Sequence, residues 1–392
     1  MKKNIKIFDT TLRDGAQAPG CGLYKEEKIK IAMSLRDLGV DVIEAGFPIS
    51  STVEFESVKQ IANNNKNSNF TICAFSRVNQ IDIQRCWESV KNAKKRRIHL
   101  GIASSDLHLK NKLKLTRSEV VEKSVECIKL AKKFPWEIQF YAEDSTRSNI
   151  DFLLHLYDNI IKAGATIINV PDTTGCISNK DYFDLIKKIK TKYKNKKIKI
   201  STHCHNDMGL AVSNTLNALE AGADQIECTI NGIGERCGNT SLEEIVLNLN
   251  ENSNFNKKFS HNINNQKLYK NCILVSNFMN YKIPVNKSLV GSNAFATEAG
   301  IHADGNIKNK YNYLFFNPNK YGRKEEIVLG ARSGKSSLKW KMNKMGYKIK
   351  DLEKFDKFYT KFIKMADLNL KKRGINDKDF ERFILKNFYK KK

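Results

Sequence analysis

Two histidines separated by a single residue follow a short alternating segment of the chain. His203 and His205 lie in the run THCHND at 202–207, directly after the residues IKIS at 198–201. Side chains two positions apart in a β-strand point to the same face, so both imidazoles are expected on one side. Neutral imidazole nitrogens bind divalent metals well, whereas a hydrogen-bonded pair of histidines is the plainer alternative. The pair predicts a metal site if further ligands lie nearby.

A second polar run follows the first apolar segment of the chain. The residues IKIF at 5–8 lead into DTTLRDG at 9–15, which places Arg13 and Asp14 side by side beyond an expected strand. Asp14 offers the oxygen ligand that two histidines lack, and Arg13 offers a bidentate clamp for a carboxylate. Asp and Gly also favour ordinary turns, so this run gains meaning only together with the histidines.

Short apolar segments alternate with amphipathic helical patterns over the first 250 residues. The helical spacing is clearest at 26–38, 119–132 and 181–192. About eight such units in roughly 250 residues match a (β/α)8 TIM barrel, whereas a doubly wound sheet usually has fewer units. The expected strands are 5–8, 42–45, 71–75, 98–102, 137–141, 166–170, 199–203 and 225–229.

A barrel of this kind makes its own prediction about the polar residues. Active sites of TIM barrels lie where the strands end and the βα loops begin. The candidate residues all fall there, which favours a metal site lined by Asp14, His203 and His205 and binding Mn, Mg, Zn or Fe. The other strand-end candidates are Glu44, Glu143, Thr173 and Asn239, while His99 on the fourth strand also points near the site, although a hydrogen-bonded barrel histidine explains it equally well.

Composition limits the remaining function classes. The chain has 392 residues and a formal net charge of +26, but Lys and Asn are spread over every segment and no aromatic-basic platform accompanies them. Nucleic acid is therefore not an expected partner. No apolar run approaches the roughly 20 residues that span a bilayer, and the start leads directly into the first strand. We expect a cytoplasmic protein with reduced thiols and no membrane partner, since the nine cysteines form no C-x-x-C pair.

Several runs together resemble a known family. The chain is similar to the DRE-TIM metallolyases, and closely to their 2-isopropylmalate synthase group. The similarity covers nearly the whole chain. It rests on the runs FDTTLRDG at 8–15, VIEAGFP at 42–48, THCHNDMGLA at 202–211, ECTINGIGERCGN at 227–239, NAFA at 293–296, GIHADG at 300–305 and Ser333-Gly334.

The resemblance implies an acyltransferase of leucine biosynthesis. The implied reaction is a Claisen-type condensation of acetyl-CoA with 3-methyl-2-oxobutanoate, followed by thioester hydrolysis to (2S)-2-isopropylmalate and CoA. It also implies a divalent metal, Mn²⁺ first and Mg²⁺ or Zn²⁺ as alternatives, with acetyl-CoA as co-substrate. A homocitrate or citramalate synthase-like enzyme, a lyase running the reverse cleavage, and a non-catalytic basic binding protein remain open.

Roles follow residue by residue from the same resemblance. Asp14, His203, His205 and Asn239 would hold the metal, while Arg13, Glu44, His99 and Thr173 would bind the substrate, with Arg13 also stabilising the developing oxyanion. Glu143 and His302 are both candidates for the base, and the sequence does not decide between them. His302 would enter the active site of a partner subunit, so a homodimer is expected. Asp9 would orient Arg13, and Glu44 has an equally plain reading as an orienting residue.

Three features concern substrate choice and organisation. Tyr141 stands where the family often has Ser, and a bulky ring there would reshape the substrate pocket. We expect a barrel at 1–250, an Asn-rich linker at 251–265, and an α-rich subdomain at 266–392 that mediates dimerisation and completes the active site. The resemblance also leads us to expect a short form without a C-terminal leucine-binding regulatory domain.

Overall fold

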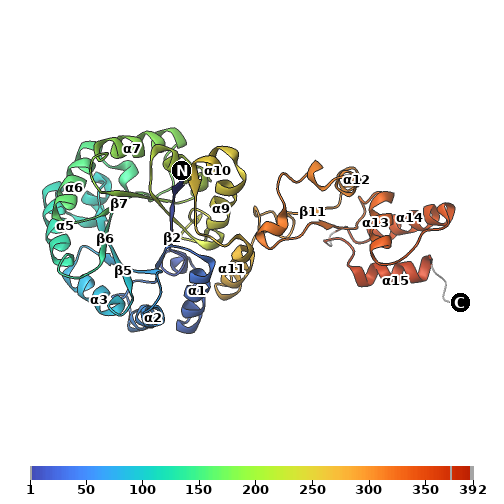
Figure 1. The fold of residues 1–392 in the computed structure, drawn as a ribbon, viewed down its shortest axis with the longest axis horizontal. Helices are drawn as coiled ribbons and strands as arrows, with labels where there is room; N and C mark the ends of the chain where they lie inside the picture. The colour runs from blue at the N-terminus through green and yellow to red at the C-terminus, as the bar shows by residue number, and fades with distance from the viewer. Residues whose placement is uncertain (1, 371–372, 389–392) are drawn as a thin grey trace. The chain divides into compact units, whose positions relative to one another are not determined.

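The computed structural model describes residues 2–370 and 373–388, and its chain divides into two compact units, 1–283 and 284–392. In the first unit, eight parallel strands close into a barrel with neighbours in chain order, which confirms the TIM-barrel prediction (Figure 1). All eight expected strands are present. They are β2 (Lys6–Asp9), β3 (Val42–Glu44), β4 (Thr71–Arg77), β5 (Lys95–Ala103), β6 (Glu137–Glu143), β7 (Ile167–Asp172), β8 (Lys199–Cys204) and β9 (Gln225–Cys228).

Helices surround the strands on the outside of the barrel (Figure 1). Strands of a parallel barrel are buried on both faces, which is why β7, for example, is buried at every position. Helix α6 shows how the helices are delimited, because Asn149 caps its first turn and Gly164 follows its last residue. The helices are α1 (Lys25–Leu38), α2 (Thr52–Asn63), α3 (Gln80–Val90), α4 (Asp106–His108), α5 (Arg117–Ala131), α6 (Ile150–Ala163), α7 (Asn179–Lys192), α8 (Ala211–Ala221) and α9 (Leu242–Glu251), with a π-helical turn at Leu109–Leu113.

The boundary between the units differs from the predicted one. The stretch expected to be a linker forms α10 (Ser253–Lys258) and the short strand β10 (Phe259–Ser260), which pairs with β1 (Lys3–Asn4). Helix α11 (Asn265–Phe278) then packs against α1 within the first unit. Asn252 and Asn264 cap these helices, so their polarity reflects helix starts rather than a flexible linker. The division lies at Ile283 and Pro284 instead of near 250–266.

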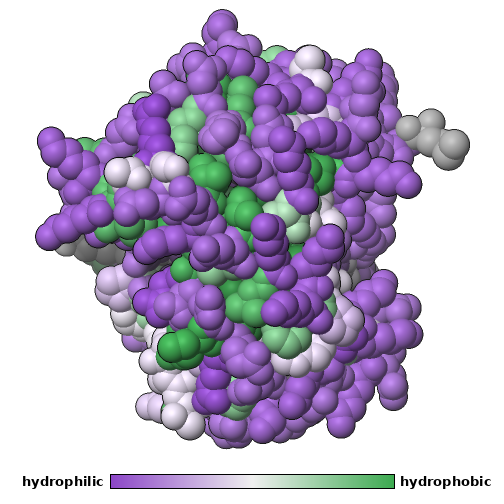
Figure 2. Space-filling model, turned by 90° about the vertical axis from the view of Figure 1, so that its left-hand side faces the viewer, coloured by the Kyte–Doolittle hydropathy of each residue, from purple (hydrophilic) through white to green (hydrophobic). Residues whose placement is uncertain are grey.

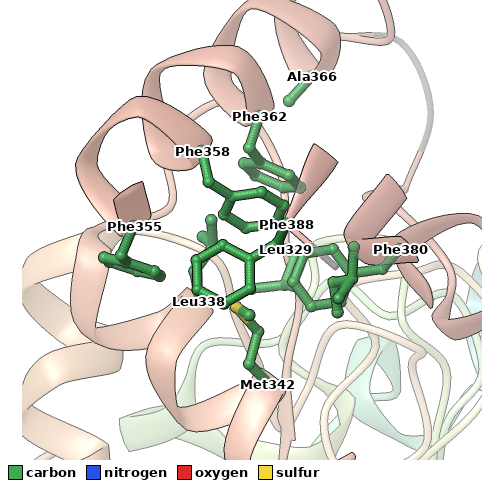
Figure 3. Close-up of a cluster of buried hydrophobic side chains, with 10 residues drawn as sticks. Leu329, Leu338, Met342, Phe355, Phe358, Phe362, Ala366, Phe380 and Phe388 are labelled. Atoms are coloured by element: carbon green, nitrogen blue, oxygen red, sulfur yellow. The ribbon is translucent and has the colours of Figure 1, made fainter. Parts of the chain in front are cut away.

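The second unit is mainly helical and has its own hydrophobic core. Its helices are α12 (Gly300–Lys308), α13 (Lys335–Lys344), α14 (Leu352–Asp367) and α15 (Asp377–Asn387), and β11 (Ala296–Thr297) pairs with β12 (Glu326–Ile327). Aromatic residues dominate the core, in which the Phe358 ring lies 5.4 Å from that of Phe388 (Figure 3). Helix α15 ends at Asn387, and residues 389–392 lie outside the described residues.

The surface agrees with the charge of the chain. The face shown in Figure 2 is mainly hydrophilic, with hydrophobic side chains visible between the polar ones. Across residues 2–370 and 373–388, no helix is both long and apolar enough to cross a membrane.

Candidate functional site

A cavity of about 200 Å³ opens at the carboxyl ends of the barrel strands. This is the end at which TIM barrels carry their active sites. Seven of the predicted site residues line it: Arg13, Asp14, His99, Glu143, Thr173, His203 and His205. The sequence pattern therefore brought together residues from four βα units and from the strand β5.

The predicted metal ligands converge on one wall of this cavity. The Nε2 atoms of His203 and His205 lie 3.1 Å apart, and they lie 3.4 Å and 3.8 Å from Asp14 Oδ2. One ligand atom from each of the three residues falls within 4.8 Å of the others. All three residues are buried. The arrangement resembles a donor set that surrounds a common point.

Unpartnered polar atoms in the same place indicate that these residues fit a cation. Two neutral imidazole nitrogens at 3.1 Å cannot both satisfy their lone pairs with each other. His205 Nδ1 and Asn239 Oδ1 are buried without a hydrogen-bond partner in the described structure. Buried polar atoms of this kind are costly, and a divalent ion held by Asp14, His203 and His205 would compensate that cost.

The ionisation of two of the three residues, Asp14 and His205, suits the same purpose. Burial raises the pKa of Asp14, but Arg13 and the two imidazoles outweigh it and lower that pKa to about 2. Burial and the neighbouring His203 lower the pKa of His205 to about 4. At neutral pH the site therefore offers a carboxylate and a neutral imidazole, the forms that bind metal.

A turn rich in left-handed residues delivers Asn239 to the site. Its Nδ2 donates to Asp14 Oδ2 at 2.9 Å, and its backbone N–H donates to the carbonyl of Gly232. Gly238 has φ +91°, and a Cβ there would lie 2.1 Å from the Gly232 oxygen. The glycines of this loop thus shape the turn that brings Asn239 to the site.

Arg13 is held by Glu44 rather than by Asp9. Arg13 Nε donates to Glu44 Oε2 at 2.6 Å, and its Nη1 lies 3.2 Å from Asp14 Oδ1. The other Glu44 oxygen lies 2.7 Å from His99 Nδ1, and Glu44 is not among the residues that line the cavity. Glu44 therefore orients Arg13 and His99, whereas the carboxylate of Asp9 accepts from the backbone and hydroxyl of Thr11.

The two remaining cavity candidates lie at the carboxyl ends of two adjacent strands, Glu143 as the last residue of β6 and Thr173 directly after β7. The Glu143 carboxylate accepts from Lys112 Nζ at 2.7 Å and 2.9 Å, and it lies 3.2 Å from His108 Nδ1. Thr173 Oγ1 accepts from the backbone N–H of Asp144, which leaves the Thr173 hydroxyl hydrogen to be donated. At the cavity, Glu143 therefore offers hydrogen-bond acceptors, whereas Thr173 offers a donor.

Tyr141 forms an aromatic wall of the cavity. Its ring stacks on Phe75 at 5.1 Å and meets His99 edge-on at 5.0 Å, while its hydroxyl donates to the carbonyl of Ser76. Gly101 makes room for the ring, because a Cβ there would lie 2.6 Å from Tyr141 Cγ. The ring also lines a second hollow on the side of Lys112 and Lys123.

His302 belongs to the second unit. It lies on α12, is exposed, and its ring is 4.5 Å from that of Tyr313. The cavity of the first unit is lined by residues of that unit alone. A role for His302 in catalysis remains a prediction.

Sequence reasoning missed several cavity residues. Asn169 lies on β7, which is separated from the β5 strand of His99 by β6. Its Nδ2 is 3.4 Å from His99 Nε2. Arg236 adopts φ +55° and binds both Asp207 and the carbonyl of Thr173. The GER triplet at 234–236 was the sequence signal that could have identified Arg236. Its charged pair precedes Asn239 by only a few residues and therefore belongs to the loop that carries Asn239.

Two family models cover most of the chain. The HMGL-like model matches residues 4–275, and the model for the homocitrate synthase post-HMGL domain matches residues 289–370. The first match alone covers more than half of the chain and corresponds to the barrel unit. The barrel is thus an HMGL-like domain.

Sequence relatives and solved structures agree with this class. The chain is 45% identical to a 2-isopropylmalate synthase of Pyrococcus furiosus over 98% of this chain and 76% of the relative. It is 44% identical to one of Dictyoglomus turgidum over 97% and 74%. A hydroxymethylglutaryl-CoA lyase structure from Pseudomonas aeruginosa shares the fold, with TM-score 0.62, 16% identity, and 72% and 95% of the two chains covered. The chain therefore belongs to the 2-isopropylmalate synthase family.

Proposed function

We infer that the protein is a synthase that condenses acetyl-CoA with 3-methyl-2-oxobutanoate and hydrolyses the thioester, giving 2-isopropylmalate and CoA. One observation carries this inference most directly. Asp14, His203, His205 and Arg13 meet in one cavity of a chain that is 45% identical to a 2-isopropylmalate synthase over 98% of its length. Such a protein is a transferase of leucine biosynthesis.

The metal site is part of the proposal. Asp14, His203 and His205 would hold a divalent cation, and Asn239, whose Nδ2 donates to Asp14 Oδ2 and whose amide oxygen has no partner in the described structure, would complete the set. The family resemblance puts Mn²⁺ first and Mg²⁺ or Zn²⁺ as alternatives, since mixed nitrogen and oxygen ligands by themselves do not choose among these metals. When bound, such a cation supplies Lewis acidity to the keto group of the 2-oxo acid.

The residues around the metal ligands would position the 2-oxo acid. Arg13 would donate to the substrate oxygen that gains negative charge, and its link to Glu44 keeps the guanidinium in place. The free hydroxyl hydrogen of Thr173 would bind the substrate carboxylate. His99 would contact the substrate from the opposite wall, held by Glu44.

The proton that leaves the methyl group of acetyl-CoA needs an acceptor. Glu143 is a carboxylate on the cavity wall, so it would take this proton and give it up to solvent afterwards. Lys112 and His108 now hold that carboxylate and would have to release one of its oxygens. His302 is the other candidate, and we propose that it acts from the partner subunit of a homodimer that the second unit helps to form. A cytoplasmic location and the absence of nucleic-acid partners also remain parts of this proposal.

A thiol-release assay tests the function. Purified protein, acetyl-CoA and Mn²⁺ are mixed with 3-methyl-2-oxobutanoate, pyruvate or 2-oxoglutarate, and free CoA is followed. Release that requires 3-methyl-2-oxobutanoate, and that disappears with EDTA or in His203→Ala, supports the proposal. Release with pyruvate or 2-oxoglutarate alone would keep the chemistry and change the substrate. No release with any acid would reject the synthase activity.

A further inference from the structure

Glu227 is a buried carboxylate that none of the roles above uses. It lies on β9 and is 1% exposed. Its Oε1 accepts from Gln139 Nε2 at 2.6 Å and from Ser201 Oγ at 2.9 Å. Its Oε2 lies 3.3 Å from Nδ1 of His203 and has no hydrogen-bond partner in the described structure, so the histidine is the group placed to supply one. Glu227 thus connects a metal-binding histidine with polar groups deeper in the barrel.

Arg97, deeper in the barrel, sets which groups donate and which accept in these hydrogen bonds. Arg97 has only donors, and its Nη1 donates to Gln139 Oε1 at 2.9 Å and to Gln225 Oε1 at 2.7 Å. Gln225 Nε2 also donates to Gln139 Oε1, at 3.0 Å. The Gln139 oxygen is therefore occupied as an acceptor, and its NH₂ group has to face Glu227.

The position of Glu227 also determines which nitrogen of His203 carries the hydrogen. A carboxylate can only accept, so the His203 Nδ1 facing it has to carry the hydrogen. The lone pair of neutral His203 then lies on Nε2, the atom that faces Asp14 and His205. His205 has no such guide, because its Nδ1 has no partner in the described structure.

We propose that Glu227 is a positioning residue that fixes the tautomer and ring orientation of His203, and that Arg97, through Gln139, sets the direction of this hydrogen-bond chain. The inference rests on the metal site of the proposed function. Partners of metal-binding histidines orient the ring and raise its basicity. The polar interior of the barrel therefore prepares one ligand of the site for metal.

Glu227→Gln is the first test. If the amide oxygen faced His203, its NH₂ group would meet the NH₂ of Gln139. The amide therefore turns the other way and donates to His203 Nδ1, which moves the histidine proton to Nε2. We expect the affinity for Mn²⁺, measured by titration of the metal-free protein at pH 8, to fall by about 10- to 100-fold. Nitrogen-15 NMR of labelled histidine should show the proton of His203 on Nδ1 in the wild type and on Nε2 in the variant.

A double variant separates this role from a merely structural one. In Gln139→Glu with Glu227→Gln, the new carboxylate accepts from Arg97, Gln225 and the amide at 227. The carbonyl of that amide can then accept from His203 Nδ1. Each side chain keeps nearly the same shape, but the direction of the bonds is restored. We expect the double variant to regain most of the Mn²⁺ affinity and the wild-type tautomer.

Glu243→Gln is the matched control. Glu243 is as buried as Glu227, and it accepts from the Ser241 hydroxyl and the Asn231 backbone. Its substitution should leave Mn²⁺ affinity within about twofold of the wild type. Wild-type affinity in Glu227→Gln, an unchanged tautomer, or no recovery in a folded double variant would overturn the inference. A wild type that binds Mn²⁺ but releases no CoA would instead reject the proposed function and leave this inference intact.

Discussion

Two polar groups of side chains share the interior of one barrel, and they differ in how completely they are bonded. The mouth cluster, at the carboxyl ends of the strands, comprises Arg13, Asp14, His203, His205 and Asn239. The interior network, below it, comprises Arg97, Gln139, Ser201, Gln225 and Glu227. In the mouth cluster His205 Nδ1 and Asn239 Oδ1 have no partner in the described structure. In the interior network each amide group donates and accepts in a consistent direction.

This difference suits the mouth cluster to binding a ligand and the interior network to stabilising the barrel. A buried polar network whose amide groups are bonded in one direction makes one arrangement of the core specific, whereas unpartnered groups that converge have a ligand as their natural partner. Glu227 Oε2 has no hydrogen-bond partner in the described structure, and it faces the mouth cluster, 3.3 Å from His203 Nδ1. Variants in the mouth cluster should therefore change activity more than stability, and variants in the interior network should do the reverse.

The largest effect is expected for His205→Ala. His205 Nε2 faces the other two metal ligands, and its Nδ1 has no partner to lose. We expect CoA release to fall by about 10³-fold or more, because a metal ligand should matter more than the 10²- to 10³-fold of a single catalytic donor. The free energy of unfolding in urea should change by less than about 1 kcal/mol.

The exposed His155 on α6 provides the control for this change. His155→Ala should leave both CoA release and stability near those of the wild type. Unfolding of His205→Ala at a much lower urea concentration would contradict the division between mouth cluster and interior network, because the lost activity would then follow from lost structure.

Arg97→Met should produce the second largest effect, this time on stability. Arg97 is 3% exposed, its Nε and Nη2 contact Glu137, and its Nη1 donates to two glutamines. Removing it leaves Glu137 Oε2 and Gln225 Oε1 without this donor, while Gln139 Oε1 keeps its bond from Gln225 Nε2. Breaking a buried ion pair from one side costs about 3 kcal/mol or more, so we expect a loss of that size in urea unfolding.

Lys95→Met, two residues earlier and exposed, is the matched control. It should change the free energy of unfolding by no more than about 0.5 kcal/mol. An Arg97→Met protein as stable as the wild type would show that the interior network does not support the barrel.

Arg97 also shows where sequence reasoning ends. It belongs to the charged run KKRR at 94–97, yet β5 begins at Lys95 and Arg97 is buried in the barrel. By contrast, all eight strands and seven cavity residues could be predicted, because strand spacing and strand-end position fix which side chains meet. Glu227, Gln139 and Gln225 escaped because their meaning depends on pairing between strands that are distant in sequence. The supposed linker escaped because asparagine caps helices as readily as it fills loops.

Two buried aspartates near the end of β2, Asp9 and Asp14, have pKa values shifted in opposite directions, and this predicts how stability depends on pH. Burial raises the pKa of Asp9 to about 7, although hydrogen bonds from Thr11 oppose it, whereas Arg13 and the imidazoles lower that of Asp14 to about 2 despite burial. An unfolded Asp titrates near pH 3.9, so between about pH 4 and 7 the folded protein binds a proton at Asp9 that the unfolded chain does not. Stability should therefore fall as pH rises through this window, by up to about 1.4 kcal/mol per pH unit from this residue.

Asp9→Asn keeps the shape and removes the titration. Urea unfolding of both proteins at pH 4.5, 5.5, 6.5 and 7.5 measures the effect, and the advantage of the variant should grow with pH. Parallel curves over this range would mean that Asp9 does not hold a proton in the folded state.

Tyr141→Ser should give the smallest effect, on substrate choice rather than on rate or stability. The Tyr141 ring walls the cavity and is fixed by Phe75, His99 and the space above Gly101. Its removal should let a longer 2-oxo acid, such as 4-methyl-2-oxopentanoate, compete better with 3-methyl-2-oxobutanoate. One methylene is worth about 1 to 3 kcal/mol in a pocket, so the ratio of the two kcat/KM values should shift by roughly 10-fold. Tyr141→Phe keeps the ring and should keep the wild-type ratio, and an equal shift in both variants would assign selectivity to the hydroxyl. An unchanged ratio in Tyr141→Ser would mean that other residues at the mouth of the barrel limit the length of the 2-oxo acid.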